Sequence, residues 1–174
     1  MAEHGRGVVI WDRVVRGCHW SVATLFLLDY WLLEGGESAH EWVGYALAAL
    51  VFVRIVWGFV GSRHARFRDF LSTPVRLRQY LGRFPPDHRA WPGHNPLGAL
   101  MVLFLWFMLL LTAASGWMQE LDAFWGEEWP QCLHEYAADA VMIAVVVHVA
   151  AVLLMQRLTG VSLVRTMISG RRDS

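Results

Sequence analysis

The sequence has 174 residues, the length of one domain, and 56% of them are apolar. Its mean hydropathy is +0.36, and its ten tryptophans are of a type that gathers at membrane interfaces. A soluble four-helix bundle would need a polar face on every helix, and the segment MVLFLWFMLLL at 101–111 has none. The composition therefore argues against a soluble bundle and indicates a membrane protein.

Four apolar segments are each close to the roughly twenty residues that cross a bilayer as a helix. They cover residues 17–33, 41–61, 96–118 and 131–156. We expect one all-α domain over 1–174, a bundle of four transmembrane helices. No short apolar core followed by an A-x-A-like site precedes the first segment, so we expect that segment to stay in the protein as a signal anchor.

The long connection 62–95 contains FRDFLSTPVRLRQYLGRF, in which arginine alternates with Phe, Leu and Tyr. This pattern predicts a short amphipathic segment on the inner leaflet. A position beside the membrane accounts for these arginines, so we do not expect nucleic-acid binding. At the end of the connection, His94 or Asn95 can cap the third helix, and Pro96 suits its first turn.

The charges are separated along the chain although their sum is zero. All fifteen basic residues are arginine, and all except Arg54 lie before the first segment, between the second and third, or after the fourth. In the other two connections every charged residue is acidic. These residues are Glu34, Glu37, Glu120, Asp122, Glu127 and Glu128. The positive-inside rule then places both termini and the 62–95 connection in the cytoplasm.

Four histidines fall within or beside the expected helices at two depths. Fourteen residues separate His134 from His148, which is about 21 Å and nearly four turns of helix, so both side chains lie on one stripe. In the predicted orientation, His40 matches His134 near the outer face and His19 matches His148 near the inner face. Ionisable groups at membrane depth are costly and usually functional. The pattern predicts two bis-histidine haem sites, one in each leaflet.

A porphyrin between helices needs space, which small residues supply. Gly44 lies one turn after His40, and Gly116 lies in the third helix. Three alanines in the fourth helix can also leave room: Ala137, Ala138 and Ala144.

Haem propionates need cationic or hydrogen-bonding partners. Arg54 lies fourteen residues after His40, which places it near the depth of the inner haem. We expect Arg54 to pair with an inner-haem propionate, with Arg16 as a second candidate. The alternative is that Arg54 extends to the inner interface.

Other interpretations of the polar residues stay open. Imidazole also binds zinc and copper, so a metal transporter competes with the haem hypothesis. Asp29, Glu135 and Asp139 could relay protons, but we favour local hydrogen bonds. The remaining histidines in tails and connections, His4, His64 and His88, are expected to be surface residues. Cys18 and Cys132 are expected at opposite faces, and the absence of a C-x-x-C-H motif argues against covalently attached haem.

The sequence resembles the bacterial cytochrome b561 proteins and the b-type cytochrome subunits of nickel–iron hydrogenases. The resemblance covers about 11–170 and rests on WDRVVRGCHW, HEWVGY, VRIVWG, GHNPLGALM and LHEYAADAVMIAVVVHV. It implies a four-helix bundle with two non-covalent b-type haems, whose ligands map onto His19, His40, His134 and His148. It also implies electron transfer between the quinone pool and a partner outside the cytoplasm.

We therefore expect a multi-pass protein of the bacterial inner membrane that passes electrons between ubiquinone and a periplasmic partner. That partner would be a cytochrome c or a hydrogenase-like protein, and the acidic outer connections suit a basic one. One alternative is a superoxide:ubiquinone oxidoreductase, although acidic connections would not attract superoxide. A second alternative is a non-redox metal transporter or membrane anchor. Whether the protein is an enzyme, and whether it forms oligomers, stays open.

Overall fold

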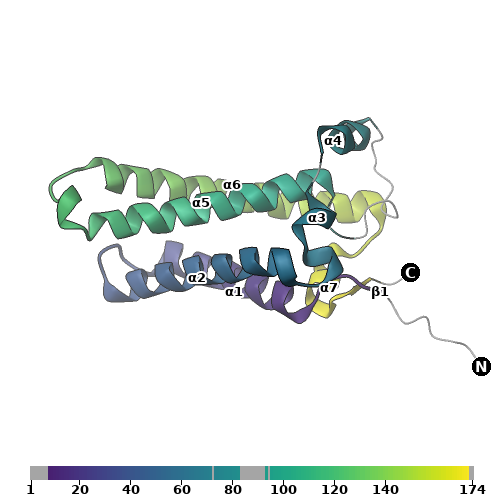
Figure 1. Cartoon of the computed structure of the whole chain (residues 1–174), viewed down its shortest axis with the longest axis horizontal. Helices are drawn as coiled ribbons and strands as arrows, with labels where there is room; N and C mark the ends of the chain where they lie inside the picture. The colour runs from purple at the N-terminus through teal and green to yellow at the C-terminus, as the bar shows by residue number, and fades with distance from the viewer. Residues whose placement is uncertain (1–7, 72, 83–92, 94, 173–174) are drawn as a thin grey trace, which may run out of the picture.

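Four long helices dominate the computed structural model, which describes residues 8–71, 73–82, 93 and 95–172 (Figure 1). They are α1 (Arg13–Leu32), α2 (Ser38–Val60), α5 (Pro96–Gln119) and α6 (Trp129–Thr159). Each begins and ends within about four residues of a segment predicted from the sequence. The shorter elements are β1 (Val8–Val9), η1 (Arg63–Ala65), α3 (Phe67–Phe70), α4 (Pro74–Leu81), η2 (Asp122–Phe124), α7 (Leu163–Ser169) and β2 (Arg171–Arg172).

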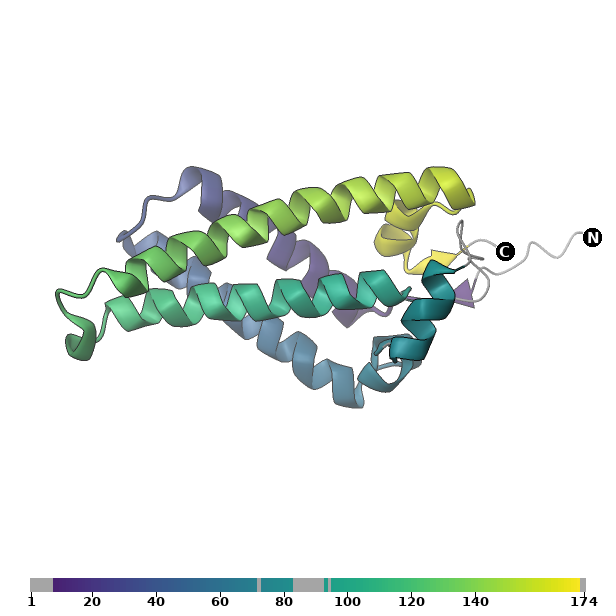
Figure 2. The ribbon, with the colours of Figure 1, turned by 90° about the horizontal axis from the view of Figure 1, so that it is seen from above.

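Two helical hairpins lie against each other in two layers. In one layer α1 packs on α2, in the other α5 packs on α6, and α2 also contacts α5 (Figure 1). The connections 33–37 and 120–128 lie at one end of the bundle, whereas α3, α4, α7 and β1 lie at the other (Figure 2). The acidic connections therefore share one end, and the described arginine-rich segments share the opposite end.

The buried core joins the two layers at mid-length. It consists of Phe26, Leu47, Val51, Leu109 and Val141. Three of these residues follow a histidine by seven positions: Phe26 follows His19, Leu47 follows His40 and Val141 follows His134. Seven residues are close to two helical turns, so each core residue lies on nearly the same face as its histidine. An apolar layer thus separates two levels of histidines.

Side-chain caps define the starts of two long helices. The Asp12 carboxylate accepts the Val15 backbone N–H at 2.9 Å at the start of α1. Asn95 accepts the Gly98 backbone N–H at 2.7 Å, and Pro96 occupies the first turn of α5. The prediction of Asn95 as a cap is confirmed, while His94 lies outside the described residues.

The two ends of the described chain are tied together. β1 and β2 pair antiparallel, with Val8 opposite Arg172 and Val9 opposite Arg171. The backbone N–H groups of Ile10 and Trp11 donate to the Gly170 carbonyl at 2.9 and 3.1 Å. This terminal clasp holds α7 against the start of α1.

Three described helices, α2, α5 and α6, are long and apolar enough to cross a membrane. All of α1 is described, and it is less apolar than these three. Large apolar side chains cover the outward faces, including Phe52, Phe59, Phe107, Ile143 and Val146. The structure thus supports a helical membrane protein, and the crossing of the membrane by α1 stays a prediction.

Candidate functional site

The first histidine pair lies at the end of the bundle that carries the acidic connections. His40 is in the first turn of α2 and His134 is near the start of α6. Their ring centroids are 5.8 Å apart, with the ring planes at 73°. An imidazole nitrogen binds a metal at about 2 Å, so two rings on opposite sides of one metal have centroids about 6 Å apart. The pair therefore has the spacing of two axial ligands.

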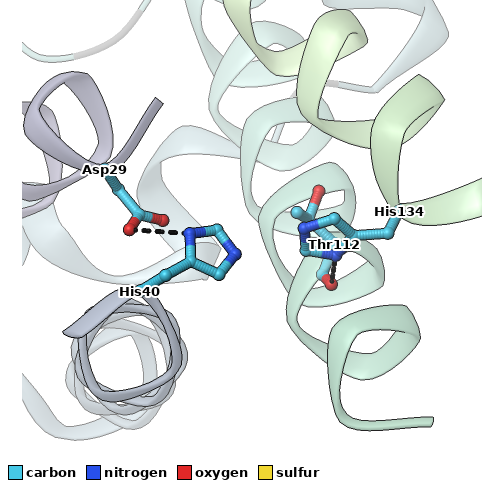
Figure 3. Close-up of polar contacts among 4 residues, drawn as sticks. All are labelled: Asp29, His40, Thr112 and His134. Carbon is cyan, nitrogen blue, oxygen red and sulfur yellow. Dashed lines mark hydrogen bonds and ion pairs between the residues drawn. The ribbon is translucent and has the colours of Figure 1, made fainter. Parts of the chain in front are cut away.

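We call His40 and His134 the outer pair, after the predicted orientation of the bundle. Each of the two rings is oriented by a partner at its Nδ1 (Figure 3). Asp29 Oδ1 of α1 lies 3.1 Å from His40 Nδ1, so the carboxylate attracts the ring N–H, although the contact lies outside hydrogen-bond geometry. On the other side, His134 Nδ1 lies 2.8 Å from the backbone carbonyl of Thr112 in α5 and can donate to it. With Nδ1 engaged in each ring, Nε2 is the nitrogen available to a metal.

A cavity opens between the two rings. Its volume is about 70 Å³, and both His40 and His134 line it. Gly44 also lines it, and a Cβ added there would meet no atom within 4 Å. The space beside Gly44 is open, and its use by a cofactor stays a prediction. A Cβ at Gly116 would lie 3.1 Å from the His134 ring, so Gly116 makes room for the imidazole.

The second histidine pair lies at the opposite level of the bundle. His19 of α1 and His148 of α6 have ring centroids 6.5 Å apart and ring planes at 54°. The Trp20 ring packs edge-on against His19 at 5.0 Å. His19 Nδ1 is buried and has no hydrogen-bond partner within the described ranges. A buried nitrogen without a partner is costly, and among the described residues His19 lacks the Nδ1 partner that both rings of the first pair have.

Arg54 is buried, with a residual exposure of 6%. Its Nη1 and Nη2 donate to the Ala65 carbonyl at 3.3 and 3.2 Å, and its guanidinium lies 5.1 Å from the centre of the Trp106 ring. It therefore holds the turn after α2 against α5. Arg16 donates to the Ile168 carbonyl, while its Nε is buried with no hydrogen-bond partner among the described residues. A propionate role for either arginine stays a prediction.

The remaining acidic groups near the outer pair make local hydrogen bonds, as the sequence favoured. The Tyr30 hydroxyl donates to Asp139 at 2.7 Å, and the Gln131 amide donates to Glu135 at 3.0 Å. Asp29 is the exception, because its neighbour is a histidine of the outer pair. Cys18 and Cys132 are both free.

One feature of the site was missed by the sequence reasoning. The Thr112 carbonyl beside His134 is a backbone group, and no residue type signals its role.

The donor set fits haem better than a tetrahedral metal ion. Structural zinc takes four protein ligands, whereas a haem iron needs only the axial ones from the protein. Within the described residues, no group of three or more His, Cys, Asp or Glu side chains converges on one point. Two separate imidazole pairs, with a cavity at one of them, would suit a group such as haem that takes few ligands from the protein at each site.

Fold and site together define a membrane-associated, helical b-type cytochrome. Residues 10–170 match the prokaryotic cytochrome b561 family, and the chain belongs to that family. Membership implies haem b and a role in electron transfer. The resemblance noted in the sequence is thus confirmed.

Three curated relatives are similar over nearly the whole chain, and each is named a probable Ni/Fe-hydrogenase B-type cytochrome subunit. The protein from Bradyrhizobium diazoefficiens is 26% identical, covering 95% of this chain and 86% of its own length. That from Rhizobium leguminosarum bv. viciae is 26% identical, with 96% and 89% covered. That from Rhodobacter capsulatus is 23% identical, with 95% and 81% covered. No solved structure matches the chain.

Proposed function

We propose that the chain is a two-haem b-type cytochrome that crosses the bacterial inner membrane four times and carries electrons between its two faces. The observation that carries the proposal is the presence of two facing histidine pairs at opposite levels of one bundle. Haem b, when bound, supplies one-electron oxidation and reduction. His40 and His134 would hold the outer group, and His19 and His148 the inner group.

The protein's own residues would fix the position and the surroundings of each group. Asp29 and the Thr112 carbonyl set the ring orientations of the outer pair. The core layer of Phe26, Leu47 and Val141 keeps water away from the space between the levels. Arg16 and Arg54 supply positive charge at the inner level.

The relatives and the charges at the ends of the bundle indicate which redox partners to expect. The named relatives are probable hydrogenase subunits, which favours a hydrogenase-like or other redox protein on the outer side. The acidic residues at that end suit a basic docking face. Within the membrane we propose ubiquinone as the second redox partner. Both termini would lie in the cytoplasm.

Haem content and ligand substitution test the proposal. The purified protein should show a haem α-band in the reduced-minus-oxidised spectrum and two haems per chain. His40→Ala or His134→Ala should remove one haem, and His19→Ala or His148→Ala the other. Combining two substitutions from the same pair should cost no second haem. A haem content well below two in the unsubstituted protein would contradict the proposal.

The same sample separates the competing activities. Reduction by ubiquinol and oxidation by a cytochrome c would support electron transfer between quinone and a periplasmic protein. Reduction by superoxide with passage of electrons to ubiquinone would instead support the superoxide:ubiquinone oxidoreductase. His64→Ala serves as a control, because its ring lies in η1 outside the histidine pairs and its loss should leave the spectrum unchanged.

A further inference from the structure

The two proposed haem sites differ in the charges built around them. At the outer site, the Asp29 side chain is only 12% exposed and lies 3.1 Å from His40 Nδ1. At the inner level, Arg54 is buried, and Arg16, one turn before His19, is half-buried, so two positive charges lie there. Asp12 is further towards that end, where it caps α1 and accepts the Trp57 indole N–H.

The Asp29 carboxylate would lower the redox potential of the outer haem through two effects. A carboxylate that attracts the Nδ1 proton makes the imidazole a stronger electron donor through its other nitrogen. Its negative charge also stabilises the ferric over the ferrous state, because that charge is little screened where water is scarce. The positive charges of Arg54 and Arg16 act in the opposite direction on the inner site. Second-shell contacts and burial are among the established means by which proteins tune haem.

We infer that Asp29 is a positioning residue that acts through His40 to make the outer haem the more strongly reducing of the two. The inference rests on the proposed two-haem function. It gives the bundle a direction: one electron leaves the outer site and enters the inner site, with no bond made or broken. A donor outside the cytoplasm would then be oxidised, and quinone at the cytoplasmic half would be reduced.

The first test is a potentiometric titration of purified holoprotein, followed in the α-band and in the ferric low-spin EPR signals. Asp29→Asn keeps the shape of the side chain and an oxygen acceptor but removes the charge. At a fixed potential it should raise the reduced-to-oxidised ratio of the lower-potential haem at least tenfold, which is 59 mV for one electron. The potential of the other haem should stay unchanged, and the EPR signal of the outer haem should change.

Asp122→Asn is the matched control. It removes the same charge from the same end of the bundle, but Asp122 is exposed in the connection 120–128, at the start of η2. Its charge is screened by solvent, so both potentials should stay within a twofold change in that ratio. An unchanged titration in Asp29→Asn, or equal shifts in both variants, would overturn the inference.

A second measurement keeps Asp29 in place and therefore does not depend on the folding of its variant. His148→Met replaces one inner ligand, and a methionine ligand raises the potential of a haem. The lower of the two potentials should stay unchanged while the higher one rises. If the lower potential moves instead, the inner haem is the more reducing and the inference is wrong. Fewer than two haems in the unsubstituted protein would be a failure of the proposed function itself.

Discussion

Arg54 is the residue at which packing and electrostatics meet in this protein. Its guanidinium joins the end of α2 to the turn at Ala65 and to the ring of Trp106 in α5. A hydrogen bond from a charged group contributes roughly 1.5–3 kcal/mol, and a desolvated cation over an aromatic ring can add about 2 kcal/mol. The same charge would also raise the potential of the inner haem.

Arg54→Leu should therefore lower the free energy of unfolding by about 3 kcal/mol, through loss of the carbonyl and ring contacts. Thermal unfolding of the detergent-solubilised protein measures this change. Arg54→Lys is the control for charge: it keeps the cation but loses the planar fork and the stacking. We expect both variants to be destabilised and only Arg54→Leu to lower the inner-haem potential. Unmoved potentials in Arg54→Leu would remove the propionate role.

The histidines could be placed from the sequence because helical geometry fixes their relation. The fourteen-residue interval and the sign of the flanking charges were enough to match His40 with His134 and His19 with His148. Contacts between helices were not accessible in this way. Asp29 lies against His40 because α1 packs on α2, and no local sequence pattern encodes that contact.

At the scale of the element, Asp12 links the start of α1 to the end of α2. Its carboxylate accepts the Val15 backbone N–H of its own helix, the Trp57 indole N–H at 2.9 Å and the Ser62 hydroxyl. Partial burial raises the pKa of Asp12, but hydrogen bonds from Ser62, Trp57 and Val15 outweigh this effect. The pKa of Asp12 is therefore lower than its ordinary value.

This lowered pKa gives a pH dependence of definite sign. The Asp12 contribution to stability is full above the ordinary aspartate pKa of about 3.9 and is lost as the pH falls through the lower native value. Asp12→Asn keeps a neutral acceptor and should lack this dependence. We expect the difference in unfolding temperature between the protein and Asp12→Asn to shrink as the pH is lowered from 7 to 3. A constant difference would contradict the assignment.

The long helices could be predicted from the lengths of the apolar segments, whereas the short elements could not. The terminal clasp has two-residue strands, too short for any periodic pattern, and it depends on the Gly170 carbonyl receiving two backbone N–H groups. The predicted amphipathic segment of the 62–95 connection contains two separate helices, α3 and α4. Thr73 caps α4, and Pro74 occupies its first turn.

At the scale of the whole molecule, separation of charge is the feature that orients the bundle. The described acidic connections and the arginine-rich segments lie at opposite ends, as the membrane rule requires. Each end of the bundle has one cysteine. Cys132, at the start of α6 near the acidic connections, is exposed, whereas Cys18, near the start of α1 at the opposite end, is buried.

Cysteine labelling can therefore test the orientation without adding any residue. A membrane-impermeant maleimide should label Cys132 in spheroplasts, where the periplasmic side is accessible, and should leave Cys18 unmodified. Cys132→Ser should abolish the labelling. Labelling of Cys132 in inverted vesicles but not in spheroplasts would reverse the predicted orientation and move the termini to the periplasm.

The position of α6 has a consequence for biogenesis. It supplies one histidine to each pair, and it is the last long helix to leave the ribosome in the described chain. Neither pair exists while α1, α2 and α5 stand alone in the bilayer. Cofactor loading would then wait for the final helix, so an unfinished chain could not retain haem, and maturation would follow membrane insertion.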